Sequence, residues 1–151
     1  MGALLIDKNA LNEVIDIISA EAFYKESHQE IFRAIKALFG DSKPIDMLTV
    51  ANFLKEEGKL DIAGGDYYLA QLTQRVSSSA HIEFHSRIIV QKYIQRELVR
   101  VASEIIRDAF DETTDVLELL DKAEARLFEI TEGNIKKNYD SAESLIQQAL
   151  Q

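Results

Sequence analysis

The chain has 151 residues, 46% of them apolar and 28% charged, enough apolar content for a packed core in one domain or two small ones. Its net charge of -9 argues against a free-standing, high-affinity nucleic-acid binder. The absence of cysteine excludes disulfides, thiolate zinc sites, iron–sulfur clusters and cysteine nucleophiles, and it fits a reducing compartment. No apolar run is long enough to span a bilayer, and Asp7 interrupts the apolar start too early for a signal peptide. We therefore expect a cytoplasmic protein.

The apolar spacing is helical along the whole chain, and it predicts an all-α fold. Six glycines and one proline indicate few turns and long regular elements. No stretch alternates apolar and polar residues over six positions, so no strand is expected. Residues 1–76 are interpreted as a small globular head of short helices. Within it, Asp46 is the expected N-cap of one helix, Gly58 closes that helix, and the pair Gly64 and Gly65 opens the next.

Residues 80–132 are predicted to form a long antiparallel helical hairpin. Neither glycine nor proline occurs from Ala80 to about Phe110, which indicates one helix of some thirty residues. The polar stretch 111–115 is the expected turn, and the return helix is predicted from Val116 to Ile130, ended by Gly133 and Asn134. Residues 133–151 are interpreted as a polar linker (133–140) and a short terminal helix, opened by a capping box of Asp140 and Glu143.

Two apolar stripes with heptad spacing predict how the hairpin closes on itself. On a helical wheel each stripe repeats every four and three residues, the rhythm of a two-helix seam. The predicted seam residues are Ile94, Leu98, Val101, Ile105, Val116, Leu120, Ala123, Leu127 and Ile130.

A second apolar face remains beside this seam, and two interpretations of it stay open. It could pack on the head of its own chain, or it could be an interface with another subunit or partner. A head of about 76 residues covers only part of so long a hairpin, and contiguous apolar surface is uncommon on monomers, so we favour the interface. The candidate interface residues are Val99, Ala102, Ile106, Phe110, Leu117 and Phe128.

Charged residues on the long helix also segregate. Four bases fall on one side of the wheel, namely Lys92, Arg96, Arg100 and Arg107. Residues 108–132 carry nine acids and two bases, so the return helix is strongly acidic. The basic stripe fits a solvated face with intrahelical ion pairs. The alternatives are a docking strip for an acidic partner protein and, as a rival function, a helical nucleic-acid-binding module.

No catalytic constellation stands out. The chain lacks a phosphate-binding G-x-x-x-x-G-K-[ST] sequence, and no nucleophile has a recognisable context. His81 and His85 are four residues apart, a spacing at which two imidazoles can share a metal, but no third ligand is nearby in sequence. A small metal-dependent hydrolase is thus a third alternative, and no catalytic, cofactor or metal residue is assigned.

Several short stretches, taken in order, resemble a known family. They are Gly2-Ala3-Leu4-Leu5-Ile6-Asp7, Phe23-Tyr24 with His28 and Ile31-Phe32, Pro44-Ile45-Asp46 with Leu48-Thr49, Gly64-Gly65 with Tyr68-Leu69, and Ser79-Ala80 with Ile82-Glu83. Their order and spacing resemble the N-terminal domain of bacterial DnaB-type replicative DNA helicases, to about residue 132. No single motif is diagnostic, but the joint order is specific.

The resemblance implies a non-catalytic domain for DNA replication, built as a helical head and a hairpin. It implies that hairpins pair between subunits, that the domains form a trimer of dimers on a hexameric ring, and that this collar docks the C-terminal helicase-binding domain of primase and can contact a loader. No membrane contact and weak or absent DNA contact are expected.

The resemblance also implies that ATP and Mg belong to a motor domain beyond Gln151, so no cofactor is expected in this fragment. Met1 resembles a truncated start, because the family usually has a longer lead-in. A linker helix docking on a neighbouring motor is implied, with Leu145, Ile146, Ala149 and Leu150 as its apolar side.

Overall fold

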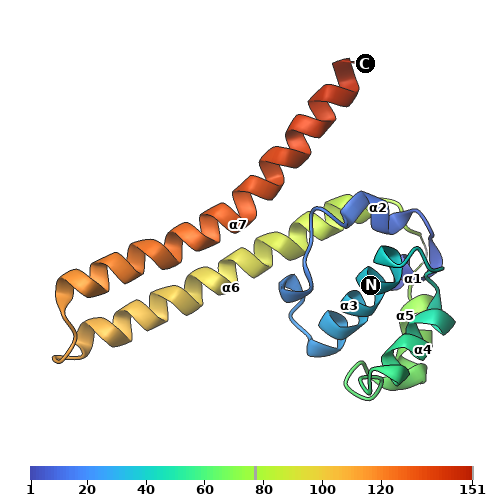
Figure 1. The fold of residues 1–151 in the computed structure, drawn as a ribbon, viewed down its shortest axis with the longest axis horizontal. Coiled ribbons are helices and arrows are strands. Elements are labelled where there is room, and N and C mark those ends of the chain that lie inside the picture. Colours follow the sequence, from blue (N-terminus) through green and yellow to red (C-terminus); the bar gives the residue numbers. More distant parts are fainter. Residues whose placement is uncertain (77, 151) are drawn as a thin grey trace. The chain divides into compact units, whose positions relative to one another are not determined.

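The computed structural model describes residues 1–76 and 78–150, and for residues 135–145 it describes the backbone alone. The described chain is helical with no strand, as predicted (Figure 1). The elements are α1 (Gly2–Ile6), α2 (Ala10–Val14), the 3-10 helix η1 (Ala20–Ala22), α3 (Glu26–Gly40), α4 (Met47–Glu56), α5 (Gly65–Gln74), α6 (Ile82–Phe110) and α7 (Val116–Leu150). They form two compact units, residues 1–90 and 91–151.

The first unit, called the head below, is built around α3. This helix buries one apolar face, with Ile31, Phe32 and Ile35 fully enclosed, because apolar residues recur every three or four positions. Helix α4 packs on α3, while α5 contacts both α4 and α1. Gly2 permits the close approach of α1 to α5, since a Cβ atom there would lie 2.1 Å from the carbonyl oxygen of Leu72.

The helix ends of the head follow the local sequence signals. The Asp46 carboxylate accepts the backbone N–H of Thr49 at 2.9 Å, and the Thr49 hydroxyl accepts the N–H of Asp46 at 3.0 Å, a reciprocal capping box. After α4, Gly58 adopts a φ of 68°, and Gly64 precedes α5 with a φ of 102°. These left-handed conformations suit glycine, and the predicted helix boundaries at these positions are confirmed.

The head also includes the first residues of α6, so the boundary between the two compact units lies beyond the predicted end of the head. Ile82, Ser86 and Val90 are buried at steps of four residues, one face of the helix start. The Ser79 hydroxyl donates to the Asp7 carboxylate, which ties the connector before α6 to the end of α1. Asp7 also accepts the backbone N–H of Asn9 at 2.9 Å. The hydrogen bond from Ser79, followed by that from Asn9, lowers the pKa of Asp7.

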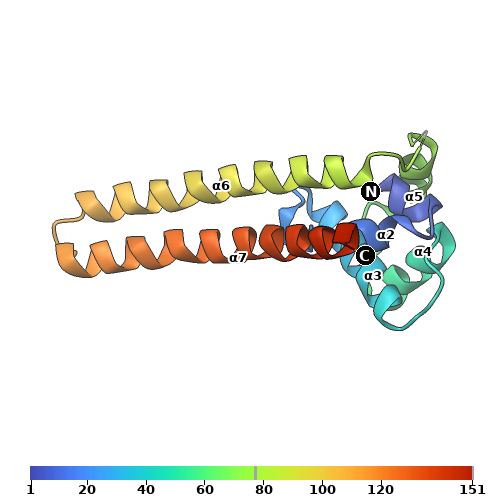
Figure 2. The ribbon, with the colours of Figure 1, turned by 90° about the horizontal axis from the view of Figure 1, so that it is seen from above.

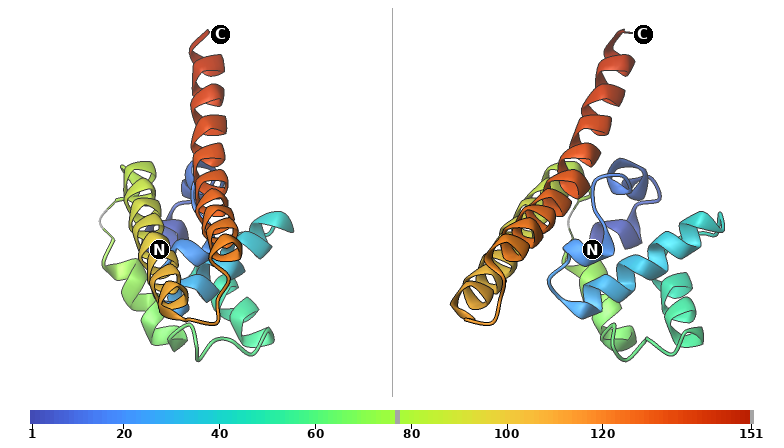
Figure 3. Two further views of the ribbon diagram at one scale, coloured as in Figure 1. Left: turned by 90° about the vertical axis from the view of Figure 1, so that its left-hand side faces the viewer. Right: turned by 60° about the vertical axis from the view of Figure 1, so that its left-hand side comes forward.

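The second unit contains the end of α6 and the whole of α7. Figure 1 and Figure 2 both show residues 91–110 of α6 beside the first half of α7, running in opposite directions. The turn between them faces the viewer in the left view of Figure 3. Asp115 starts α7, because its carboxylate accepts the backbone N–H of Glu118 at 3.0 Å. The predicted hairpin with a turn at residues 111–115 is present.

The predicted end of the return helix is wrong. Helix α7 continues without a break from Val116 to Leu150, so Gly133 and Asn134 do not stop it and residues 133–140 are not an irregular linker. One glycine inside a helix costs about 1 kcal/mol, which good helix formers on both sides offset. The Asn134 amide donates to the Ile130 carbonyl at 2.8 Å, a bond within the helix that this residue was expected to end. Asp140 and Glu143 lie inside α7, and their side chains fall outside the described residues.

Candidate self-association surface of the hairpin

The seam between α6 and α7 is narrow and partly charged. Val101 is its one completely buried side chain in the described part of the second unit. Ile94 and Ile105 on α6, and Ala123 and Ile130 on α7, are half-buried. Leu119 and Arg126 complete the inward face of α7.

An ion-pair group links the two helices across this seam. Arg126 of α7 places its guanidinium Nη1 3.2 Å from Glu104 and 3.7 Å from Asp108, both on α6. All three side chains are only about 30% exposed, so solvent screens the attraction less than at an open surface. Sequence reasoning missed Arg126, because it counted this residue only as one of two bases on an acidic helix. The sequence did contain a signal, because Glu104 and Asp108 are one helical turn apart on α6 and Arg126 is a base on the return helix. The aliphatic part of an arginine side chain is long enough to lie along a seam.

Four of the predicted seam residues do not close the hairpin. Leu98, Val116, Leu120 and Leu127 are each more than 40% exposed in the structure. The stripe of α7 that turns inward passes through Leu119, Ala123, Arg126 and Ile130, rotated from the expected one. The expected stripe was chosen by apolar character alone, whereas the stripe that meets α6 includes Arg126, whose ion pairs with Glu104 and Asp108 cross the seam. Three of the five predicted seam residues of α7 are therefore exposed, whereas on α6 only Leu98 is.

The candidate interface residues are exposed in this structure, without exception. Phe110, Leu117 and Val99 are 85%, 74% and 67% exposed, and Ile106, Phe128 and Ala102 also face solvent. Within the described residues of the second unit, nothing covers them. This agrees with a surface that awaits a partner, although exposure alone does not identify the partner.

Leu98, Ala102 and Ile106 of α6 lie on the same side of the hairpin as Val116, Leu120 and Leu127 of α7. The most exposed members, Val99, Phe110, Leu117 and Phe128, lie further round, towards the outer edges of the two helices. At about 100° per residue, the exposed apolar residues of α6 are displaced clockwise from the seam when the helix is viewed from its N-terminus. Those of α7 are also displaced clockwise when α7 is viewed from its own N-terminus. Because the two helices face each other and run in opposite directions, both displacements lead to the same side of the hairpin. We call this surface the apolar face, formed by Leu98, Val99, Ala102, Ile106, Phe110, Val116, Leu117, Leu120, Leu127 and Phe128.

The opposite side of the hairpin is charged, and much of its basic stripe is neutralised. Arg100 donates to Glu97 at 2.8 Å and to Glu104 at 2.9 Å. The hydrogen bonds and charges of these carboxylates, Glu97 first, raise the pKa of Arg100. Arg107 contacts Asp108 at 3.4 Å, and the Arg96 guanidinium lies 5.8 Å from the centre of the Tyr93 ring. Lys92 is exposed on the same helix. These pairs reduce the charge available to phosphates, so the structure gives the nucleic-acid alternative no support.

The end of α7 carries the residues expected on a linker helix. Ile146, Ala149 and Leu150 are exposed, whereas the side chain of Leu145 lies outside the described residues. Their docking on another domain stays a prediction.

The structure also places the histidines that the sequence analysis considered. No three His, Cys, Asp or Glu side chains gather in the described residues in a way that could hold a metal ion, so His81 and His85 gain no third ligand. His28 is half-buried and is hydrogen-bonded through Nε2 to the Tyr68 hydroxyl at 2.6 Å, as befits a boundary histidine. Among the described helices, none is both long and apolar enough to cross a membrane.

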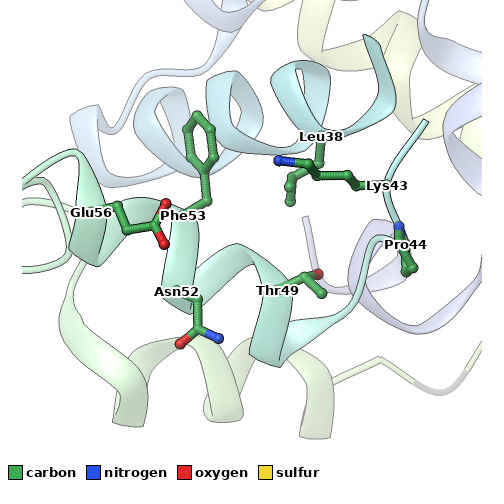
Figure 4. A pocket seen from close by; sticks show the side chains of 7 residues that line it. All are labelled: Leu38, Lys43, Pro44, Thr49, Asn52, Phe53 and Glu56. Carbon is green, nitrogen blue, oxygen red and sulfur yellow. The ribbon is translucent and has the colours of Figure 1, made fainter. Parts of the chain in front are cut away.

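A shallow groove on the head lies between α3 and α4 (Figure 4). Its volume is about 210 Å³, below the range of ordinary small-molecule sites. The lining residues are Leu38, Lys43, Pro44, Thr49, Asn52, Phe53 and Glu56. Thr49 is already used in the capping box of α4. We assign no ligand to this groove.

Comparison with known proteins decides the family. Residues 1–91 match the model of the DnaB-like helicase N-terminal domain. The chain belongs to this family. The replicative DNA helicase DnaB of Rhodothermus marinus is 38% identical over all 151 residues, and that of Geobacillus stearothermophilus is 31% identical over 96% of this chain. The chain spans 16% and 34% of the lengths of these two DnaB proteins.

Solved DnaB structures agree with this assignment. The N-terminal domain of DnaB helicase from Mycobacterium tuberculosis has a TM-score of 0.80 and 31% identity, over 85% of this chain and 90% of that one. A DnaB-like replicative helicase, solved in a study of its interactions with primase, has a TM-score of 0.68 and 22% identity over 95% of this chain and 33% of that one. The second likeness bears on the fold alone. The family resemblance inferred from the sequence is thus confirmed, and the all-α fold with it.

Proposed function

We propose that this domain is a non-catalytic assembly domain of a hexameric replicative DNA helicase, in which the apolar face of the hairpin binds a second copy of the chain. The observation that carries the proposal is the apolar face itself, which spans two helices and is exposed in the described part of its own unit. A surface of this kind is costly to leave in water, and a second copy offers a self-complementary cover. Three such pairs around a ring would form the collar that the family resemblance implies.

The test is the solution mass of the domain over a concentration series, measured by sedimentation. We expect a dimer or a multiple of it. Ile106→Asp places a charge in the middle of the apolar face, and it should weaken association by at least about tenfold because the carboxylate would be desolvated. Ala125→Asp introduces the same side chain on the charged side of the hairpin and is the matched control.

Circular dichroism should show equal helicity for both variants and the parent, since both positions are exposed on helices. A parent domain that stays monomeric at every concentration would contradict the proposal, as would an Ile106→Asp variant that associates like the parent.

A second part of the proposal is that the assembled domain docks the C-terminal helicase-binding domain of primase. Its support is family membership together with the DnaB-like structure solved in a study of its primase interactions. Titration calorimetry of the domain with that primase fragment should show saturable binding, whereas an unrelated helical domain of similar charge should show none. A helicase loader is a further candidate partner for the same titration.

The proposal assigns no chemistry to this chain. Its sequence contains no G-x-x-x-x-G-K-[ST] motif to hold the phosphates of ATP. ATP hydrolysis and strand separation would then reside in another part of a helicase of this family. The domain alone should hydrolyse no ATP above the buffer rate, and hydrolysis that copurifies with it through two different columns would contradict this assignment.

A further inference from the structure

The outward side of α6 in the second unit carries a depression that the hairpin itself does not use. Val99 and the buried seam residue Val101 are two positions apart, which places them about 200° apart around the helix. Val99 is 67% exposed on this outward side. The open depression there is lined by Lys92, Gln95, Arg96 and Val99. It therefore faces away from the seam with α7.

The spacing of the four lining residues defines what the depression can hold. Positions i, i+3, i+4 and i+7 of one helix form the hole that receives a single side chain of a facing helix in a coiled coil. Val99 gives this hole an apolar wall, which the aliphatic stems of Lys92 and Arg96 extend. We call it the basic hole, formed by Lys92, Gln95, Arg96 and Val99. Its geometry suits the side of another helix.

The basic hole is positively charged in a chain whose net charge is -9. Lys92 and Arg96 are one helical turn apart, and no acid lines the hole. Lys92 is exposed, and the Arg96 guanidinium lies 5.8 Å from the centre of the Tyr93 ring, a contact that holds it at this part of the helix. A complementary occupant therefore combines an apolar side chain with negative charge close to it.

We propose that the basic hole binds an amphipathic helix of a different protein, with an apolar side chain in the hole and carboxylates within one turn of it on either side. Carboxylates at such flanking positions of a facing helix pair with bases across the interface. Single-stranded nucleic acid stacks its bases on aromatic side chains, and none lines the hole. The charge and shape of the hole thus favour a helical protein partner.

This docking surface is separate from the proposed self-association. The basic hole shares only Val99 with the apolar face, and Val99 lies at the outer edge of that face. Ala102 and Ile106 lie nearer the seam, on the side assigned to the second copy.

A designed peptide tests the proposal in the intact domain. The probe is a fluorescein-labelled peptide of about three heptads, with leucine at the a and d positions and glutamate at e and g, so that like charges keep it from pairing with itself. Its fluorescence anisotropy should rise to saturation as the domain is added. The double variant Lys92→Gln, Arg96→Gln should bind it about tenfold more weakly, because two attractive charge contacts are lost. The same peptide with glutamine in place of glutamate should bind the parent domain about as weakly.

The matched control is the double variant Arg107→Gln, Lys122→Gln. It loses the same net charge at exposed positions outside the hole, so it should bind the peptide like the parent. Equal weakening of the two double variants, or a parent domain without saturable binding, would overturn the proposal. Displacement of the peptide by an equal concentration of oligothymidylate would identify a phosphate-binding strip and would also overturn it.

Sedimentation separates this proposal from the proposed function. The Lys92→Gln, Arg96→Gln variant should self-associate like the parent. If it associates more weakly, a second copy occupies the basic hole, and the proposed partner is wrong while self-association stands. A parent that binds the peptide but stays monomeric would overturn the proposed function and support the basic hole as a docking site.

Discussion

The head and the hairpin are both helical, yet they bury their apolar residues in opposite ways. In the head, Ile31, Phe32, Ile35 and Val50 are fully enclosed by their own unit. In the described part of the second unit only Val101 is enclosed to that degree, while Phe110 and Leu117 are among the most exposed apolar residues of the chain. The head has the core of an independent folding unit. The hairpin leaves much of its apolar surface exposed to solvent, which the proposed self-association would cover.

The sharpest test of this contrast is the same substitution in both regions. Phe32→Ala should destabilise the head by about 3–5 kcal/mol, because it leaves a cavity in a core with no exposed neighbour to fill it. Phe128→Ala removes the same ring from the apolar face and should change the free energy of unfolding of the single chain by less than about 0.5 kcal/mol. Urea unfolding measures both values, at a protein concentration low enough to keep the chain monomeric.

At higher protein concentration the two variants should differ less in their loss of stability, because Phe128→Ala would then also weaken the assembled form. An equal and large loss of stability for both variants at low concentration would mean that the ring of Phe128 is covered within its own chain. The comparison between a closed head and an open hairpin would then fail.

A second and smaller effect concerns the charged seam of the hairpin. Arg126→Met keeps much of the stem but removes the charge that Glu104 and Asp108 share. Because these side chains are partly buried, we expect a loss of about 1–2 kcal/mol in the stability of the hairpin. Lys122→Met is the matched control, since Lys122 pairs only along its own helix, with Glu118 at 3.2 Å, and is more than half exposed.

Hydrogen exchange of the α7 amides near Arg126 reads out this prediction in the intact domain. Faster exchange in Arg126→Met, with the rate of the control unchanged, would support the cross-helix pairs as the feature that sets the seam. If exchange in the two variants is alike, the half-buried aliphatic residues alone hold the helices together.

Local signals in the sequence were sufficient for most of the fold. The N-cap at Asp46, the glycines beside α4 and α5, and the polar stretch before Val116 each act on a neighbouring turn, so they can be recognised without tertiary information. Gly133 was misinterpreted because the cost of one helical glycine is small and depends on the residues around it.

The hairpin surface shows where sequence reasoning reached its limit. Heptad spacing identifies an apolar stripe on α7, but it does not say whether that stripe meets α6 or a second chain. Leu120 and Leu127 were assigned to the seam, yet the stripe that meets α6 is the neighbouring one, which contains Arg126, and both leucines are exposed. The exposed interface candidates could be predicted because the hairpin helices carry more apolar residues than the seam with one partner helix can cover. The choice between stripes depends on a contact across the hairpin, which spacing along one helix does not contain.

The smallest expected effect is a pH dependence of the head. Burial, followed by the positive charges of the N-terminus and Lys25, lowers the pKa of His28 below its ordinary value. The unfolded chain therefore binds this proton more readily than the folded one, so the stability contributed by neutral His28 is present above the ordinary histidine pKa and is lost as pH falls below it. Burial also lowers the pKa of the Met1 amine, which contributes a pH dependence of the same sign at higher pH.

Comparing variants separates the contribution of His28 from that of the Met1 amine. His28→Gln should lose less stability than the parent between pH 7.5 and pH 5.5, measured by thermal unfolding, while the same substitution at the exposed His85 is the control for removing an imidazole. A His28→Gln variant as pH-sensitive as the parent would show that the hydrogen bond to Tyr68 serves packing alone, with no part in the proton linkage of the head.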